Sequence, residues 1–294
     1  MRRAAVSSAA LLGWYEPRRA AYPWRLRPTP YRVLVSEIML QQTQAARVAP
    51  AFERFVAAFP SVRALADASQ GEVLRAWDGL GYNRRAIALS RAARQIVVRH
   101  GGRVPRDAAA LRALPGVGPY TADAVAALAF AEPRVAFDVN VRRVAARALL
   151  GAEPQDAAPE DVAEAARRWL GRSSPVDWNQ AVMDLGREVC RPAPRCDGCP
   201  LRSSCRFAGM VRKEARGSRR PQAPFRGSMR QVRGDVVRAL RLRSPASLRS
   251  LAAATGHTRG RVREAVRALH RDGVVTAGPG ALEGRPRGIV SLPK

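Results

Sequence analysis

The sequence predicts an all-α protein that ends in a small winged-helix-like domain. Ala, Leu, Arg and Glu recur at helical spacing through most of the chain, and Gly or Pro interrupts each run. Strand-like runs are nearly absent before residue 270. Beyond that point two short β-like runs, 273–276 and 288–292, lie on either side of a glycine-rich turn. Three helices followed by two such runs are the element order of a winged helix.

The helices are expected to follow one another along the chain with short breaks. Phe52, Phe55 and Phe59 give one of them an apolar stripe at helical spacing. Ser69 and Glu72 form a capping box at the start of another. The sequence predicts helices over 30–47, 49–59, 73–77, 84–100, 108–114, 121–130, 139–150, 159–170, 179–189, 231–242, 247–255 and 258–271.

Composition divides the chain into three predicted parts. Residues 1–208 form the main helical domain, which includes a cysteine-rich loop over 190–205. Residues 209–229 are rich in Arg, Ser, Gly and Pro and form a basic linker. Residues 230–294 form the winged-helix-like domain. Its last helix carries four arginines that either contact nucleic-acid phosphates or are simply solvated on a helical cap: Arg259, Arg261, Arg263 and Arg267.

The overall charge indicates a polyanionic partner. The 294 residues include 51 Lys+Arg against 24 Asp+Glu, which gives a formal net charge of +27. At 47%, the hydrophobic fraction is higher than a ribosomal or chromatin-packing protein requires. We expect neither secretion nor a membrane span, because no signal sequence and no run of about 18 apolar residues occurs. Clustered thiols fit a reducing cytoplasm, where the partner would be nucleoid DNA.

All four cysteines of the chain lie within sixteen residues, with the spacing C-x5-C-x2-C-x5-C. Four thiolates can hold either a zinc ion or a [4Fe–4S] cluster. Zinc sites usually pair two tight C-x2-C hooks, and this loop has one, so the spacing favours the cluster. The alternatives are zinc, and two disulfides or uncoordinated thiols. The predicted ligands are Cys190, Cys196, Cys199 and Cys205. Arginines between and beside them would face a phosphate backbone.

A Gly-x-Gly turn in the segment 114–122 joins two predicted helices. Gly116 and Gly118 would let the backbone adopt a positive φ and approach another molecule closely. The following helix would offer unpaired N–H groups at its start, and such a turn can hold a phosphate without side chains. A tight connection between two helices also needs glycine, so a purely structural role is the alternative.

Two carboxylates lie in apolar surroundings. Glu37 interrupts the apolar run 34–40, where burial would raise its pKa and let it carry a proton at neutral pH. Asp138 follows Val135, Ala136 and Phe137, so it is either the N-cap of the helix that follows or a catalytic group.

The motifs and their order resemble those of adenine DNA glycosylases of the MutY type, in the helix-hairpin-helix superfamily that includes endonuclease III. The resemblance covers roughly residues 10–208 and rests on the segments 22–25, 36–44, 79–82, 114–121 and 138–143 and on the cysteines. It implies a two-lobed, monomeric, all-α enzyme of base excision repair with a [4Fe–4S] cluster. Such an enzyme binds double-stranded DNA that contains a mismatched or damaged pair and flips the target nucleotide out.

The resemblance also implies roles for individual residues. Glu37 would protonate the departing adenine at N7, and Asp138 would stabilise the oxocarbenium-like sugar with support from Tyr120 and Asn140. Three residues would line the base pocket: Trp24, Arg25 and Gln180. Gln42 and Tyr82 would wedge into the duplex.

Tyr120 stands where bifunctional relatives have a lysine that attacks the sugar. Tyrosine cannot form the imine, and the only lysines of the chain are Lys213 and Lys294. We therefore expect a monofunctional glycosylase. The first cysteine gap has five residues where the family usually has six. Well-known members also add a Nudix-like domain, which we do not expect over residues 209–294, because this segment is too short and too helical for it. A thymine or uracil mismatch glycosylase, and a non-enzymatic iron–sulfur DNA-binding regulator, are the alternatives.

Overall fold

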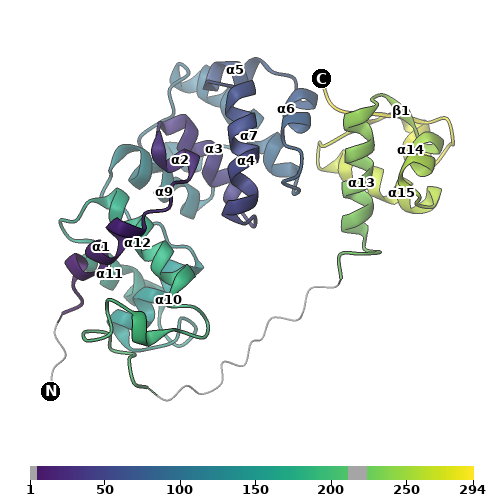
Figure 1. Ribbon diagram of the computed structural model, residues 1–294. Helices are drawn as coiled ribbons and strands as arrows, with labels where there is room; N and C mark the ends of the chain where they lie inside the picture. The colour runs from purple at the N-terminus through teal and green to yellow at the C-terminus, as the bar shows by residue number, and fades with distance from the viewer. Residues whose placement is uncertain (1–4, 211–223) are drawn as a thin grey trace. The chain divides into compact units, whose positions relative to one another are not determined.

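A computed structural model describes residues 5–210 and 224–294 of the chain (Figure 1). Helices dominate these residues, and short strands occur in them only from Ala246 onward. The contacts divide the chain into two compact units, Met1–Glu37 with Val104–Ala215 and Ile38–Arg103 with Arg216–Lys294. None of the described helices is both long and apolar enough to span a bilayer. The predicted all-α fold class is confirmed.

The first unit is built from helices in two stretches of the chain, and its boundary at Glu37 falls within the last turn of α3. They are α1 (Ser8–Tyr15), α2 (Pro23–Leu26), α3 (Pro30–Leu40), α8 (Ala108–Arg112), α9 (Pro119–Phe130), α10 (Val139–Ala145), α11 (Pro159–Leu170) and α12 (Pro175–Glu188). A π-helical turn, Ala146–Leu150, extends α10, and single 3-10 turns cover Glu16–Arg18 and Cys196–Gly198.

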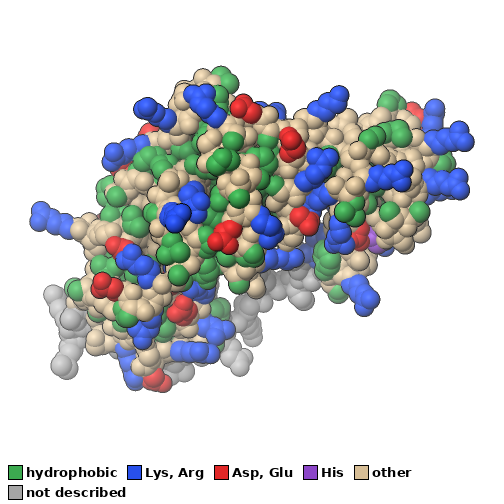
Figure 2. Space-filling view, turned by 45° about the horizontal axis from the view of Figure 1, so that its top comes forward, with side chains coloured by type: hydrophobic (Ala, Val, Ile, Leu, Met, Phe, Trp, Pro, Cys, Tyr) green, Lys and Arg blue, Asp and Glu red, His purple; other side chains and the backbone are tan. Residues whose placement is uncertain are grey.

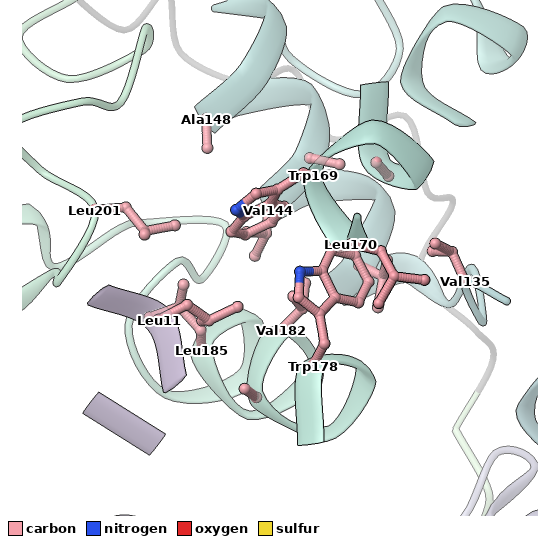
Figure 3. Close-up of a cluster of buried hydrophobic side chains, with 14 of the residues drawn as sticks. Leu11, Val135, Val144, Ala148, Trp169, Leu170, Trp178, Val182, Leu185 and Leu201 are labelled. Carbon is pink, nitrogen blue, oxygen red and sulfur yellow. The ribbon is translucent and has the colours of Figure 1, made fainter. Parts of the chain in front are cut away.

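Two tryptophans form the centre of the first unit's core (Figure 3). Trp169 of α11 and Trp178 of α12 meet edge to face, with ring centroids 5.1 Å apart. Leu11, Val144 and Leu185 bring α1, α10 and α12 into the same cluster. This packing fixes α12 against α10, and these two helices carry Asn140, Gln180 and Asp184 of the site described below.

The second unit combines a helical lobe with the C-terminal domain. The lobe contains α4 (Ala45–Ala58), α5 (Val62–Asp67), α6 (Gln70–Ala76) and α7 (Arg84–His100). The domain contains α13 (Met229–Leu242), α14 (Leu248–Thr255), α15 (Arg259–Arg271) and α16 (Pro279–Glu283), with strands β1 (Ala246–Ser247), β2 (Thr276–Ala277) and β3 (Ile289–Ser291). The strands are antiparallel in the order β1-β3-β2, so that Val290 pairs with both Ala246 and Ala277. These helices and the short antiparallel sheet are the elements that the sequence predicts for the winged-helix-like domain.

Most of the predicted helices are present. The bounds of α7 and α11 agree with the prediction, and Ser69 and Glu72 form the predicted capping box of α6. The single helix predicted over 30–47 was wrong, because the chain leaves the helix after Leu40 and Gln42 adopts a φ of 58°. The helix predicted over 139–150 is instead α10 followed by the π-helical turn. Of the predicted linker 209–229, residues 211–223 lie outside the described part of the chain.

Candidate active site and cysteine centre

Glu37 is a buried carboxyl group in the first unit, with 4% of its surface exposed. Its neighbours on α3 include the buried Val33, Leu34 and Ile38. Burial raises its pKa from the ordinary 4.5 to about 7, and the charge of Asp138 acts in the same direction. A hydrogen bond from Tyr120 and the charge of Arg25 oppose the rise. A carboxyl group with this pKa can both hold and release a proton at neutral pH.

The two oxygens of Glu37 differ in their environment. Tyr120, in the first turn of α9, forms a hydrogen bond with the Glu37 side chain. Burial, together with the charges of Glu37 and Asp138, raises the tyrosine's pKa well above 10.0, so its hydroxyl remains a donor. Glu37 Oε2 has no hydrogen-bond partner among the described residues. A buried, unpartnered carboxyl oxygen is costly, and such groups occur where a ligand or a water is to be bound.

Asp138 is also largely buried, but it differs from Glu37 because both of its carboxyl oxygens accept hydrogen bonds. It is the N-cap of α10, and its Oδ1 accepts from the backbone N–H groups of Asn140 at 2.9 Å and Val141 at 2.6 Å. Its Oδ2 accepts from Asn140 Nδ2 at 2.8 Å. Burial is the largest influence and raises the pKa of Asp138 above its ordinary 3.8, although these hydrogen bonds and the charge of Arg143 oppose the rise. The capping role and a position beside Glu37 therefore coexist in one residue.

The residues predicted to line a base pocket lie in the same unit. Arg25 makes a two-pronged ion pair with Asp184, with distances of 2.7 and 3.1 Å. The ring of Trp24 stacks on the ring of Tyr22, with the ring centroids 4.9 Å apart. Gln180 is buried, and its Oε1 accepts a hydrogen bond from the Tyr15 hydroxyl at 2.6 Å.

Sequence analysis missed two members of this group, Tyr15 and Asp184. Asp184 was detectable, because it is a carboxylate within the apolar run 181–185, which is the same signal that identified Glu37. Tyr15 gave no such signal, since a tyrosine at the end of an apolar helix is ordinary core. Only the fold brings Tyr15 to α12, 165 residues further along the chain.

The glycines of the hairpin behave differently from each other. Gly116 has a φ of 79°, as predicted for the turn. Gly118 has a φ of −85° and is the N-cap of α9, so the prediction of a positive φ was wrong there. A Cβ added at Gly118 would meet no protein atom within 4 Å. Neither backbone conformation nor packing within the protein therefore requires glycine at this position, which leaves room for close approach by another molecule.

In the second unit, Gln42 and Tyr82 are exposed, and both have a left-handed backbone, with φ of 58° and 46°. Among the described non-glycine residues only these two and Ala131 have a positive φ. Arg85 links the segments that carry these two residues. Its guanidinium donates to the carbonyl of Met39 at 2.7 Å, shortly before Gln42, and to the carbonyl of Gly81 at 3.2 Å, directly before Tyr82. Strained backbone held by such a network is typical of functional positions.

The four cysteines line a single pocket, together with Arg147 and Phe207. All four are free thiols, which argues against the disulfide alternative. No group of three or more His, Cys, Asp or Glu within the described ranges is arranged to hold a single metal ion. The four cysteines around one pocket suit a [4Fe–4S] cluster, which takes one thiolate on each of its irons.

Two arginines organise the cysteine loop. Buried Arg147 pairs with Glu153 at 2.8 Å and donates to the carbonyl of Arg191 at 2.7 Å. Arg143 donates from Nε to the carbonyl of Cys190 at 2.6 Å and from Nη2 to Asn140 Oδ1 at 2.7 Å. The loop is thereby joined to the residue that holds Asp138. Burial raises the pKa of the Cys190 thiol, and it raises that of Cys199 to about 11.

Glycine at position 186 allows this close approach. A Cβ at Gly186 would lie 2.6 Å from the Cβ of Asn140, so no larger residue fits between α12 and the start of α10. The carbonyl of Gly186 also accepts from Arg143 at 2.7 Å. The sequence offered no sign of the roles of Gly186, Arg143 and Arg147.

Comparison with known proteins gives the same assignment. The family described as "HhH-GPD superfamily base excision DNA repair protein" matches residues 35–172. The adenine DNA glycosylase of Mycolicibacterium smegmatis is 41% identical over 239 residues, which cover 80% of each chain. A thermostable thymine-DNA glycosylase structure aligns with a TM-score of 0.64 and 29% identity over 68% of this chain and 94% of that one. An endonuclease III–DNA covalent intermediate aligns with a TM-score of 0.58 and 23% identity over the same shares, which shows the fold alone. The 41% identity with the Mycolicibacterium smegmatis enzyme, together with the order of the motifs, confirms the predicted family. The chain belongs to the adenine DNA glycosylases of the HhH-GPD superfamily.

Proposed function

We propose that this DNA glycosylase hydrolyses the N-glycosidic bond of adenine mispaired with 8-oxoguanine or guanine in double-stranded DNA. The observation that carries the proposal is Glu37, a buried carboxyl group with a pKa of about 7 and one unpartnered oxygen. Adenine leaves poorly as an anion, so its departure requires protonation, here at N7. A general acid is most effective when its pKa lies near the working pH.

Glu37 and Asp138 divide the work because their environments differ. Glu37 is largely desolvated and delivers the proton, and afterwards it assists the incoming water. Burial raises the pKa of Asp138, but three hydrogen bonds and the helix start oppose the rise and stabilise its charged form. A charged Asp138 stabilises the positive sugar that develops as the base leaves. Tyr120 orients Glu37, and Asn140 orients Asp138.

The other predicted residues supply recognition. Trp24, Arg25 and Gln180 line the site for the flipped base, and their hydrogen bonds to Asp184 and Tyr15 keep the polar groups in fixed orientations. Gln42 and Tyr82 enter the duplex where the base leaves it. The hairpin glycines Gly116 and Gly118, together with the N–H groups at the start of α9, bind a phosphate.

The cofactor of this enzyme is a [4Fe–4S] cluster, held by Cys190, Cys196, Cys199 and Cys205. When bound, the cluster ties the loop into one shape and adds no chemistry to base release. Four exposed arginines of the loop then contact the DNA backbone: Arg191, Arg195, Arg202 and Arg206. Figure 2 shows Lys and Arg side chains over much of the visible face with fewer Asp and Glu among them, in keeping with a net charge of +27.

The enzyme acts as a monomer. It is monofunctional, because Tyr120 cannot form an imine with the sugar. The winged-helix-like domain adds DNA contacts through arginines of α15.

The test is single-turnover release of adenine from a duplex with adenine opposite 8-oxoguanine. Glu37→Gln keeps the shape of the side chain and removes the proton donor, so we expect base release to fall by at least about a thousandfold, with DNA affinity retained. Glu164→Gln, on the exposed face of α11, is the matched control and should release adenine at the wild-type rate. Base release that survives Glu37→Gln would remove the proposed general acid.

A further inference from the structure

The C-terminal domain contacts the turn that carries Tyr82. Arg241, near the end of α13, donates from Nε to the carbonyl of Leu74 at 2.8 Å and from Nη2 to Asn83 Oδ1 at 3.0 Å. Its Nη1 donates to Asp78. Only 12% of the Arg241 side chain is exposed. Asp78 and Asn83 flank the segment 79–82, so one guanidinium holds both ends of that turn.

Further contacts show that both surfaces are shaped for each other. The N–H group of Gly71, in the first turn of α6, donates to the carbonyl of Pro293 at 2.8 Å. A Cβ at Gly71 would lie 2.9 Å from that carbonyl oxygen, so glycine is required for the approach. Asp272, which follows α15, lies 3.7 Å from the Arg84 guanidinium. Glycine is unfavourable in a helix, so the presence of Gly71 in α6 fits its contact with the C-terminal segment at Pro293.

The turn itself has an unfavourable backbone. Gly79, Gly81 and Tyr82 all have positive φ, at 82°, 68° and 46°. For tyrosine this conformation is uncommon, and it persists only where surrounding contacts hold it. Half of the Tyr82 surface is exposed, at 50%, so packing of its ring supplies little of the restraint. Arg85 holds the carbonyls of Leu80 and Gly81 from within the lobe, and Arg241 holds the two flanking side chains from the C-terminal domain.

We infer that Arg241 is a positioning residue, through which the C-terminal domain fixes the 79–82 turn and presents Tyr82 to the duplex. The inference rests on the proposed function, because it assumes that Tyr82 enters DNA as the base is flipped. It assigns the domain a role inside the catalytic cycle, separate from any DNA contact made by α15. Arg241 acts through Tyr82 and does not itself touch the substrate.

The experiment compares Arg241→Gln with Arg238→Gln in the full-length protein. Arg238 lies one turn earlier on α13, is 68% exposed, and pairs only with Asp235 among the ion pairs of the described residues, so its variant loses the same charge without the contact. We expect Arg241→Gln to slow single-turnover adenine release by between about threefold and tenfold, a range typical of residues that act through a neighbour. Arg238→Gln should match the wild type.

Two readouts separate positioning from a general loss of stability. In a Tyr82→Ala background, Arg241→Gln should cause no further slowing. On a duplex whose target adenine lies in an unpaired bubble, the Arg241→Gln defect should also disappear, because no wedge is needed there. If Arg241→Gln lowers the yield of folded protein, Asp78→Ala removes the ion pair with Arg241 from the side of the lobe and should give the same pattern with a smaller slowing.

The outcomes distinguish the inference from the function on which it rests. A wild type that releases no adenine from any mismatch would end the proposed function. If the wild type is active and Arg241→Gln releases adenine at the same rate, the positioning role is wrong and the proposed function stands. Equal slowing by Arg241→Gln with and without Tyr82 would also overturn it, because the arginine would then act by another route.

Discussion

Glu37→Gln should make the protein more stable while it abolishes base release. Burial raises the pKa of Glu37 from 4.5 to about 7, so the folded state binds this proton more tightly than the unfolded state. Stability is therefore lost as the pH rises from 4.5 through about 7. Each pH unit in that window corresponds to about 1.4 kcal/mol, which makes the carboxylate cost about 3 kcal/mol above it. Glutamine has the same shape and no such cost.

The assay is urea unfolding of both proteins at several pH values, followed by the fluorescence of buried Trp77 and Trp178. Between about pH 5.5 and about pH 8.5, the free energy of unfolding of the variant should gain about 2 kcal/mol on the wild type. Glu72→Gln is the control whose effect should not change across this window, because capping hydrogen bonds with Ser69 lower the pKa of Glu72 below its ordinary 4.5 and keep it ionised throughout. An advantage of Glu37→Gln that did not change with pH would refute the assignment of a buried, proton-holding carboxyl.

Four further predictions concern the site. Single-turnover adenine release should fall about tenfold per pH unit above pH 7, because Glu37 then loses its proton; a rate that stays level to about pH 9 would contradict this. Wild-type protein should give no borohydride-trapped complex with abasic DNA, whereas Tyr120→Lys should give one on the same gel. Gly186→Ala should slow base release and cost about 1 to 3 kcal/mol in urea unfolding, because its Cβ would press on Asn140. Cys199→Ala should lose the visible absorbance of the cluster and much of its DNA affinity in a fluorescence anisotropy titration, and retention of full affinity would contradict the structural role of the cluster.

Sequence patterns were sufficient for the elements whose signals are local. Helical spacing gave the bounds of α7, and the pair Ser69 and Glu72 gave the capping box of α6, although that helix begins at Gln70 and not at the predicted Val73. They failed at the break after Leu40, because Gln41 to Gln44 are acceptable helix residues and only their tertiary contacts make them a turn. Arg85 supplies those contacts from far along the chain, by donating to the carbonyls of Met39 and Gln41.

The candidate site shows the same division. Glu37 was detectable because a carboxylate in an apolar run is rare, and Asp138 because it follows one. Tyr15, Arg143 and Gly186 were not, since each matters through a partner that lies more than forty residues away. The role of Arg241 was equally hidden, because an arginine near the end of a basic helix looks solvated until the fold brings Asp78 and Asn83 to it.

The most direct test of the central claim is base release with excess protein from four duplexes, which carry adenine opposite 8-oxoguanine, adenine opposite guanine, thymine opposite guanine and uracil opposite guanine. We predict fast release of adenine, with the 8-oxoguanine duplex leading, and no release of thymine or uracil. Release of thymine or uracil alone would contradict the proposed substrate. Release from none of the four, by a protein that still binds them, would leave a DNA-binding regulator in place of the enzyme.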